Sequence, residues 1–280
     1  GSHSLRLHLC GVRGSTPAPG PDFVRYGGHT SCVAVAHDGD VPTLVLDAGT
    51  GLRNVTALLD GEPYRGALVL GHLHWDHTQG IPFFVGGDRE GARVDVYLPE
   101  QGDEVEVLER FMSPPHFPIG VDGLNGEWTV HGLEEGRRDI EVFSVLALDI
   151  PHKGGRMLGF RVEAGGSSFA YLSDHSPLTI GPGPEGLGAY HENALRLASG
   201  VDLLIHDAQH TAEELPARAH FGHSAAEYAV GLAWEADARS VLLFHHDPNR
   251  TDDQLDELSK RFADAPVPVT AGAEGAVIDL

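Results

Sequence analysis

The chain has 280 residues, 41% hydrophobic side chains and a formal net charge of −22 with the histidines neutral. This length can bury a substantial core, and no stretch approaches the roughly 20 apolar residues that a membrane helix needs. Phosphate-tracking surfaces need clustered Lys and Arg, and the sequence has no basic stripe. We therefore expect no membrane anchor and a partner other than extended nucleic acid.

The N-terminal residues and the cysteines bear on origin and compartment. Gly1-Ser2-His3 resembles the scar of a cleaved affinity tag, so we exclude it from the fold and from the candidate ligands. Cys10 and Cys32 are the two cysteines, and both lie among apolar neighbours. A disulfide scaffold is not expected, and reduced thiols without a signal-peptide pattern favour a cytoplasmic location.

The first predicted elements are strands at 5–10, 31–37 and 43–46, separated by Gly, Pro and Asp turns. The third strand runs into a tight turn at Asp47, which we expect to brace a neighbouring loop from behind. A helix follows at 52–59. Later predictions are strands at 67–70, 94–98, 140–146, 158–163, 168–172, 203–205 and 240–244, and helices at 224–235 and 252–262. Residues 101–136 are predicted to form an inserted helix and loop within one domain spanning 1–280.

Four polar residues follow the short apolar strand 67–70 in the stretch "GHLHWDHTQG". They are His72, His74, Asp76 and His77. Imidazole nitrogens and carboxylate oxygens are the ligands that zinc, manganese and iron(II) prefer. The alternating spacing places three of the four on one side of an extended loop and directs His77 elsewhere. Such a loop can supply ligands to two metal ions.

The second half of the chain repeats the arrangement of a strand followed by a ligand. His152 follows the segment 146–150, Asp174 follows the strand 168–172, and His245 follows the strand 240–244. We expect His72, His74 and His152 to hold one divalent ion, and Asp76, His77 and His245 to hold a second, with Asp174 bridging them. Zinc is favoured, with manganese as the alternative. Water between ions about 3.5–4 Å apart would lose its proton near neutral pH and become a nucleophile.

The segments "HLHWDH", "LSDH" and "LFHH", with the separate His152, resemble in this order the metal-binding motifs of the metallo-β-lactamase superfamily. The resemblance covers nearly the whole chain. It implies an α/β fold of the αββα type, in which two mixed sheets lie face to face, helices flank them and the metal site lies along one edge. The β-lactamases themselves have cysteine at the position of Asp174, so aspartate points to the hydrolase and phosphodiesterase branches.

A narrower resemblance covers residues 203–246. "LLIHDAQHTAEE" and "GHSAAEYAVGLAWEADARSVLLFHH" are similar to the corresponding segments of tRNase Z and related phosphodiesterases. It implies that Asp207 orients His223, although aspartate here replaces glutamate and Ala225 replaces threonine. A carboxylate-held imidazole can protonate the leaving oxygen. We therefore count Asp207 and His223, together with the ligand Asp76, as catalytic candidates.

One feature of the transfer-RNA endonucleases is missing from this sequence, and its absence bears on the substrate class. The transfer-RNA endonucleases carry a basic arm, but no Lys or Arg lies between Asp174 and Arg196 here. This disfavours RNA processing and favours the small cyclic phosphodiesterases, including the phosphoribosyl 1,2-cyclic phosphate phosphodiesterases. Candidate substrate contacts come from the Gly-rich N-terminal turns, the Pro-rich loop 113–120 and the residue after the last ligand; they are Arg13, His29, His116, Phe117 and His246.

Other functions remain open at this stage. A tRNase Z-like RNA 3′-endonuclease and a lactone or thioester hydrolase use the same scaffold. An iron oxidoreductase such as a persulfide dioxygenase generally needs one metal, whereas Asp76, His77 and Asp174 together favour two. A noncatalytic metal-binding protein would not need the Asp207–His223 pair. A homodimer is also left open.

Overall fold

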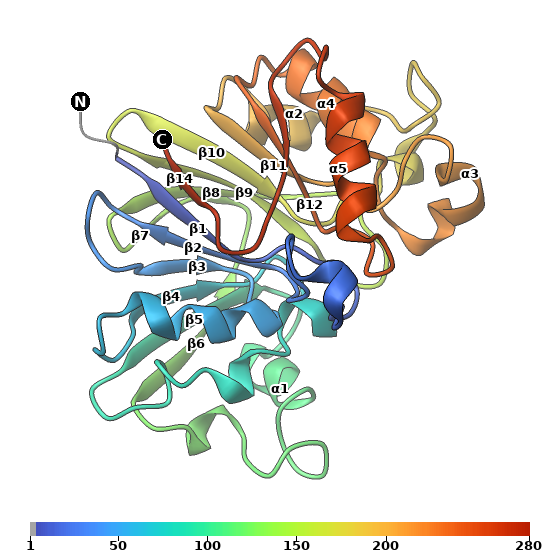
Figure 1. Cartoon of the computed structure of the whole chain (residues 1–280). Coiled ribbons are helices and arrows are strands. Elements are labelled where there is room, and N and C mark those ends of the chain that lie inside the picture. Colours follow the sequence, from blue (N-terminus) through green and yellow to red (C-terminus); the bar gives the residue numbers. More distant parts are fainter. Residues whose placement is uncertain (1–3) are drawn as a thin grey trace.

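The structure, a computed structural model, describes residues 4–280, so the tag-like residues 1–3 lie outside the described part. Two seven-stranded β-sheets pack face to face, and helices cover their outer surfaces (Figure 1). The expected αββα sandwich of two mixed sheets is confirmed. Among residues 4–280, no helix is both long and apolar enough to cross a membrane.

The first sheet has the strand order β14-β1-β2-β3-β4-β5-β6. Its strands β3 to β6 run parallel, whereas β14, β1, β2 and β3 pair antiparallel. The strands are β1 (Arg6–Gly11), β2 (Cys32–Ala36), β3 (Leu44–Leu46), β4 (Arg65–Val69), β5 (Arg93–Pro99), β6 (Glu127–Leu133) and β14 (Val277–Asp279).

The second sheet has the order β13-β12-β11-β10-β9-β8-β7. Strands β10 to β13 run parallel, and β7 to β10 form antiparallel pairs. The strands are β7 (Gly136–Ile140), β8 (Phe143–Asp149), β9 (Leu158–Ala164), β10 (Ser167–Leu172), β11 (Leu203–Asp207), β12 (Val241–Phe244) and β13 (Val269–Ala271).

Three helices cover the outer face of the second sheet (Figure 1). They are α2 (Glu192–Ala198), α4 (Ala226–Glu235) and α5 (Asp252–Arg261), whereas α1 (Glu104–Glu109) lies against the first sheet and α3 (Leu215–Arg218) precedes the loop to α4. Helix α5 begins with a capping box between Thr251 and Gln254, which satisfies two free N–H groups at its first turn. Its buried Leu255 and Leu258 face the core.

The space between the sheets is filled by alternate side chains of both inner faces. Phe160, Phe169, Tyr171 and Phe244 are fully buried there. Strand β4 and strand β12 are apolar along almost their whole length because each is covered on both faces, by the facing sheet and by outer segments. Burial on both sides explains why these two strands are readily recognised in the sequence.

The first sheet departs from the sequence predictions at two segments. The predicted helix 52–59 consists of two short 3₁₀-helices, Thr50–Asn54 and Thr56–Leu58. Val55 and Thr56 are β-branched and weaken an α-helix at its centre. Residues 101–136, expected as a helix and a loop, also contribute β6, which pairs with β5 over its whole length. This edge strand is half exposed, so its sequence lacks a continuous apolar run.

The predicted strand 140–146 is displaced in the second sheet. Ile140 ends β7, Glu141 turns with a positive φ of 54°, and β8 begins at Phe143 and continues to Asp149. The sequence analysis also missed β7, β13 and β14, and helix α2. Strand β7 is polar, and β13 and β14 have three residues each, so pairing with a neighbour rather than side-chain pattern defines them.

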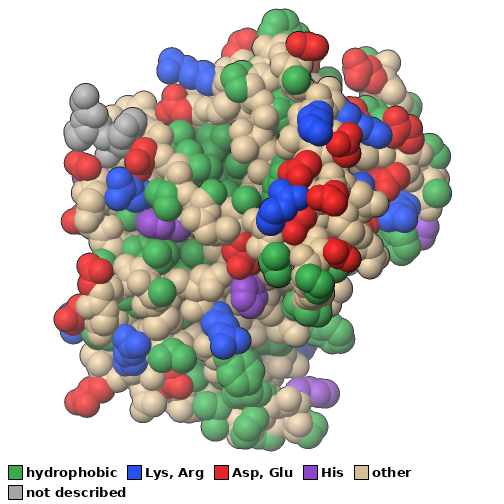
Figure 2. Space-filling view, viewed as in Figure 1, with side chains coloured by type: hydrophobic (Ala, Val, Ile, Leu, Met, Phe, Trp, Pro, Cys, Tyr) green, Lys and Arg blue, Asp and Glu red, His purple; other side chains and the backbone are tan. Residues whose placement is uncertain are grey.

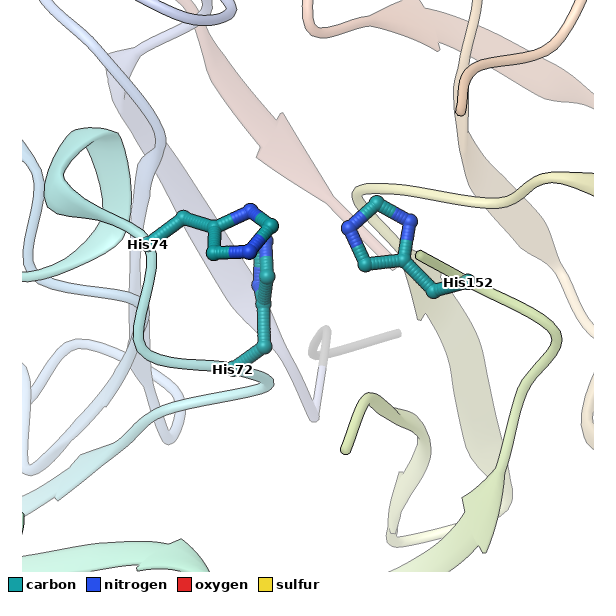
Figure 3. Close-up of side chains that lie close together, drawn as sticks. All are labelled: His72, His74 and His152. Atoms are coloured by element: carbon teal, nitrogen blue, oxygen red, sulfur yellow. The ribbon is translucent and has the colours of Figure 1, made fainter. Parts of the chain in front are cut away.

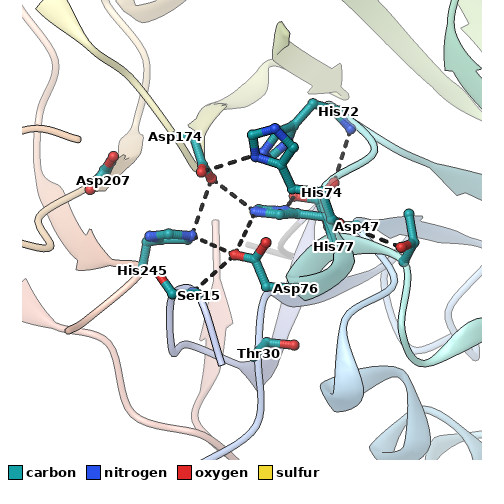
Figure 4. A network of polar contacts seen from close by, with 12 residues as sticks. Ser15, Thr30, Asp47, His72, His74, Asp76, His77, Asp174, Asp207 and His245 are labelled. Atoms are coloured by element: carbon teal, nitrogen blue, oxygen red, sulfur yellow. Dashed lines mark hydrogen bonds and ion pairs between the residues drawn. The ribbon is translucent and has the colours of Figure 1, made fainter. Parts of the chain in front are cut away.

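The ends of four strands meet at one edge of the sandwich. Strands β10, β11 and β12 are parallel neighbours, so the residues after them emerge side by side. Asp174 follows β10, Asp207 ends β11 and His245 follows β12. The loop after β4 in the facing sheet brings His72 to His77 to the same edge, where Figure 4 shows them opposite Asp174 and His245.

Candidate metal centre

The first ligand cluster consists of His72, His74 and His152. One ring nitrogen from each lies within 4.8 Å of the others, and the three rings converge from two separate loops (Figure 3). His74 Nε2 donates to the carbonyl oxygen of Gly154 over 2.8 Å, which leaves Nδ1 of that ring for a ligand. Three imidazole nitrogens pointing at one place form a typical divalent-metal site.

The second cluster consists of Asp76, His77, Asp174 and His245, all of them buried. His77 Nε2 lies 3.1 Å from Asp76 Oδ2, and His245 Nε2 lies 3.0 Å from the same oxygen. The rings of His77 and His245 are nearly parallel, with an interplanar angle of 14°. Figure 4 shows both rings directed at the two carboxylates.

Asp174, a member of the second cluster, also reaches the histidines of the first cluster. Its Oδ2 is 3.4 Å from His72 Nε2 and 3.9 Å from His152 Nε2. Its Oδ1 is 3.0 Å from His77 Nε2 and 3.3 Å from His245 Nε2. The two oxygens of one carboxylate therefore face one cluster each, as a bridging ligand requires (Figure 4).

The charge and hydrogen bonding of the site fit a divalent cation. Both ring nitrogens of His72 and of His152 are buried without a hydrogen-bond partner, as are His77 Nε2 and Asp174 Oδ1. Buried polar atoms without partners are costly, and divalent cations would satisfy one nitrogen of each ring together with the carboxylate oxygen. Burial lowers the pKa of His152 to about 3, so the ring is neutral at pH 7 and one of its nitrogens has a free lone pair.

Asp47 supports the loop after β4, as the sequence analysis predicted. Its Oδ1 accepts a hydrogen bond from the backbone N–H of Gly71 at 2.9 Å, and its Oδ2 accepts from Tyr171 Oη at 2.7 Å. Asp47 itself has a positive φ of 62°, a conformation that aspartate adopts more readily than most residues. Tyr171 was missed because it lies inside β10, where the sequence indicates only a core residue.

Asp207 and His223 form a buried pair beside the second cluster. His223 Nδ1 lies 2.9 Å from Asp207 Oδ2 and 3.8 Å from Asp174 Oδ2. Asp207 also accepts the backbone N–H groups of His175 at 3.1 Å and of Gln209 at 3.0 Å, which fix its carboxylate. Burial opposes a charge on the ring, but the nearby Asp207 carboxylate outweighs it and raises the pKa of His223 to about 9.

A cleft of about 400 Å³ opens at this edge. It is lined by Ser15, Leu73, His74, Trp75, Asp76, Asp174 and His223. Ser15 was missed by the sequence analysis: its backbone N–H donates to Asp76 Oδ2 at 3.0 Å from a turn with a positive φ of 70°. A larger hollow of about 670 Å³ lies between β7, β9 and β10 and contains none of the clustered histidines.

Two of the predicted substrate contacts are buried and do not line the cleft. The Arg13 guanidinium is fully buried and donates to the carbonyl oxygens of Gly27, Asp247 and Arg250, so it ties loops together. His246 is also fully buried; its Nε2 donates to the carbonyl oxygen of Gly272 at 2.9 Å. Strand β12 ends at Phe244 and His245 has a positive φ of 56°, so the chain turns there and the rings of His245 and His246 have different partners.

The other three predicted contacts lie outside the cleft lining. His29 Nδ1 lies 3.1 Å from Thr50 Oγ1, and His29 borders a separate hollow with Glu274. His116 is exposed, and Phe117 packs edge-on against Phe83 with ring centroids 5.8 Å apart. The Pro-rich loop thus rests on the first sheet's side of the molecule, and a role as a lid stays a prediction.

The sandwich with histidine and aspartate clusters at one edge defines a class of metal-dependent hydrolases. A family model described as "Beta-lactamase superfamily domain" matches residues 43–246, so the chain belongs to the β-lactamase superfamily. This range includes every residue of both clusters.

Individual relatives agree with this assignment. The chain is 24% identical to the ribonuclease Z of Natronomonas pharaonis over an alignment of 317 residues that includes gaps. The alignment covers 98% of this chain and 93% of that protein. It superposes on the metallo-beta-lactamase fold protein YhfI from Bacillus subtilis with a TM-score of 0.72 and 19% identity, covering 99% of both chains. A diphosphatase of the PhnP family superposes with a TM-score of 0.68 and 19% identity, covering 99% of this chain and 98% of the other. The chain is therefore a metal-dependent hydrolase.

Proposed function

We propose that the protein hydrolyses a small or cyclic phosphodiester with the help of two divalent ions, zinc or manganese. The observation that carries this proposal is the Asp207–His223 pair, which lies beside Asp174 and borders the cleft. Lactam or lactone opening has less need of a separate proton donor at this place. A phosphodiester with an alkoxide leaving group does need one.

The seven predicted ligands are assigned to two positions. His72, His74 and His152 would hold one ion, and Asp76, His77 and His245 the other, with Asp174 shared between them. The distances from Asp174 to both groups of rings and the buried unpaired nitrogens support this division. When bound, two such metal ions supply positive charge for the phosphate oxygens. They also lower the pKa of a water to near neutrality.

Two residues of the chain, Asp207 and His223, would supply the proton that the leaving oxygen needs. Asp207 holds His223 through Nδ1, so Nε2 is the nitrogen left to face a substrate in the cleft. A water that has lost one proton to solvent attacks phosphorus as hydroxide, the bond from phosphorus to the leaving oxygen breaks, and the proton on His223 Nε2 passes to that oxygen. A proton from solvent then restores the charge on His223. The high pKa of His223 keeps this proton in place at neutral pH.

RNA 3′-end processing is the second candidate, favoured by the ribonuclease Z of Natronomonas pharaonis, which matches almost the full chain. Two observations weigh toward the smaller substrate. No Lys or Arg lines the cleft. The segment after Asp174 contains no Lys or Arg before Arg196, and it is folded back by hydrogen bonds from the N–H of Gly188 to the carbonyl oxygen of Pro182 and from the N–H of Ala189 to that of Gly181.

The distribution of charged side chains on the surface also favours a small substrate over RNA. On the face drawn in Figure 2, Lys and Arg side chains lie singly or beside acidic ones, and no continuous basic stripe crosses this face. Among the described arginines, Arg25 is paired with Asp253 at 3.0 Å and with Asp256 at 2.7 Å. Paired arginines are poorly available to phosphate groups.

The deciding experiment compares both substrate classes on metal-reconstituted protein. A five-membered cyclic phosphodiester and a precursor transfer RNA with a 3′ trailer are offered at matched concentrations. We expect hydrolysis of the cyclic ester and little cleavage of the RNA. Efficient RNA cleavage would assign the protein to the second candidate, and activity on lactones or thioesters alone would reject both.

A further inference from the structure

Trp75 is an exposed aromatic side chain at the reaction site. It lies between two candidate ligands, His74 and Asp76, and 76% of its surface is accessible. It also lines the 400 Å³ cleft with Asp174 and His223. Because the indole is open in the cleft that also contains Asp174 and His223, it is available to contact a substrate held there.

The backbone holds Trp75 in a fixed place. Residues Trp75–His77 form a 3₁₀-helix, and the carbonyl oxygen of Trp75 accepts the N–H groups of Thr78 at 3.2 Å and Gln79 at 2.9 Å. The N–H of His77 donates to the carbonyl oxygen of His74 at 2.9 Å. The same short turn thus carries the indole and the candidate ligands, which sets its position relative to them.

The rest of the cleft offers few other means of binding a substrate's organic part. Leu73 is the remaining apolar residue of the lining, and the lining contains no Lys or Arg. Lys153, the cation that follows His152, donates its Nζ to the carbonyl oxygen of His220 at 2.9 Å. Trp75 and Leu73 are therefore the apolar residues of the lining that can contact the organic part of a substrate.

We propose that the Trp75 indole is a stacking platform for a planar aromatic group carried by the substrate, such as a nucleobase. This inference rests on the proposed phosphodiesterase function and narrows its substrate class to nucleoside-type esters. Stacking tolerates many rings because each has a π-face, and it contributes binding without hydrogen-bond readout. The ring of the substrate would lie on Trp75 while its phosphate reaches His223 and the ions that Asp174 would hold.

The test uses two esters that differ only in the base. Adenosine 2′,3′-cyclic phosphate and methyl riboside 2,3-cyclic phosphate share the ribose and the five-membered phosphodiester. For the wild type we expect kcat/KM to favour the adenosine ester by about ten-fold or more, the size expected of one stacked base. Trp75→Leu should bring this ratio close to one, whereas Trp75→Phe should keep most of it.

Trp234→Leu is the matched control, because Trp234 is 58% exposed on α4 and lies outside the cleft lining. It should leave the ratio unchanged. The stacking proposal would be rejected if the ratio of the two kcat/KM values is near one in the wild type. It would also be rejected if Trp75→Leu keeps the wild-type ratio. A change of oligomeric state in Trp75→Leu with the ratio retained would reject it as well, since a second copy would then be the occupant.

A binding measurement separates failure of this inference from failure of the proposed function. Adenosine 5′-monophosphate should quench tryptophan fluorescence of the wild type, ribose 5-phosphate should not, and the quenching should be lost in Trp75→Leu. If neither ester is hydrolysed, the proposed function fails for cyclic esters, and this quenching still decides the platform. Equal quenching by both ligands, or quenching kept in Trp75→Leu, would reject it.

Discussion

Nδ1 of His77 lies 2.7 Å from Oδ2 of Asp47, and both side chains are fully buried. This contact links β3 to the loop after β4 and leaves Nε2 of His77 directed at Asp76 and Asp174. A carboxylate behind a ligand histidine fixes the tautomer and the ring orientation. Asp47 is therefore a positioning residue, and its contribution can be measured separately from that of the ligands.

Asp47→Asn should lower metal affinity by about 10- to 100-fold, the usual cost of losing such a partner. Asparagine tolerates the positive φ of this position, so the backbone stays intact and the missing charge is the main change. Metal titration with a competing chelator measures the effect. Tyr171→Phe is the matched control, because it removes another bond to Asp47 and should cost about 1 kcal/mol of stability. Equal metal affinities for wild type and Asp47→Asn would contradict the role.

Asp174→Ala should remove the shared ligand between the two clusters. We expect fewer than two ions per chain at saturation and loss of most activity, because neither set of rings retains its common carboxylate. Metal analysis of dialysed protein and turnover of a phosphodiester provide the measurements. A single bound ion per wild-type chain, with full activity, would be incompatible with the dinuclear assignment.

His245 and His246 are neighbours with separate expected effects. His245→Ala should weaken metal binding, since its Nε2 faces Asp76 and Asp174. His246→Ala should instead lower stability by about 1–3 kcal/mol, because its buried ring leaves a cavity and an unpaired Gly272 carbonyl. Metal content and thermal unfolding of both variants decide the matter. Metal loss in His246→Ala without destabilisation would reverse the assignment.

His223→Ala should affect substrates according to their leaving groups. Hydrolysis of an alkyl or cyclic phosphodiester should fall by about 10²–10⁴-fold, the usual contribution of a positioned acid. Bis(p-nitrophenyl) phosphate releases a stabilised phenolate and should lose far less. Metal content should be retained, because His223 lies outside the seven assigned ligands. Equal losses on both esters with metal retained would remove His223 as the proton donor.

Asp207→Asn should change the pH dependence of the same reaction. The Asp207 carboxylate raises the pKa of His223 to about 9, and the donor must carry its proton, so wild-type activity falls as the pH rises through that value. Without the carboxylate, the pKa of His223 moves down toward 6.5 and activity should fall at a lower pH. Profiles of kcat/KM on an alkyl ester, with metal content checked at each pH, test this. If activity of Asp207→Asn falls at the same alkaline pH as that of the wild type, Asp207 does not set the pKa of the proton donor.

Local sequence patterns were sufficient to locate the candidate ligands. His72, His74, Asp76 and His77 lie within six positions, and Asp174 and His245 each follow a short apolar strand. Strands buried on both faces have continuous apolar runs, so their ends are recognisable, and parallel neighbours place those ends together. The pairing of Asp207 with His223, 16 positions apart, came instead from the resemblance of residues 203–246 to tRNase Z and related phosphodiesterases.

The errors occurred where neighbours rather than local pattern determine the structure. Strands β6, β13 and β14 are edge strands that exist because an adjacent strand pairs with them. Arg13 and His246 have side chains typical of phosphate contacts, but loops from distant parts of the chain bury them among carbonyl oxygens. No local signal records such a burial.

The sequence by itself therefore determined the candidate ligand types, which lie in short motifs, and the superfamily with its two sheets, which follow from the resemblance of those motifs to a known family. Only the tertiary structure decided how the groups are divided: Asp174 between two clusters, Tyr171 behind Asp47, and Trp75 open in the cleft. Those relationships join residues tens to more than a hundred positions apart. They arise from the packing of one sheet on the other, which a linear pattern of residues does not contain.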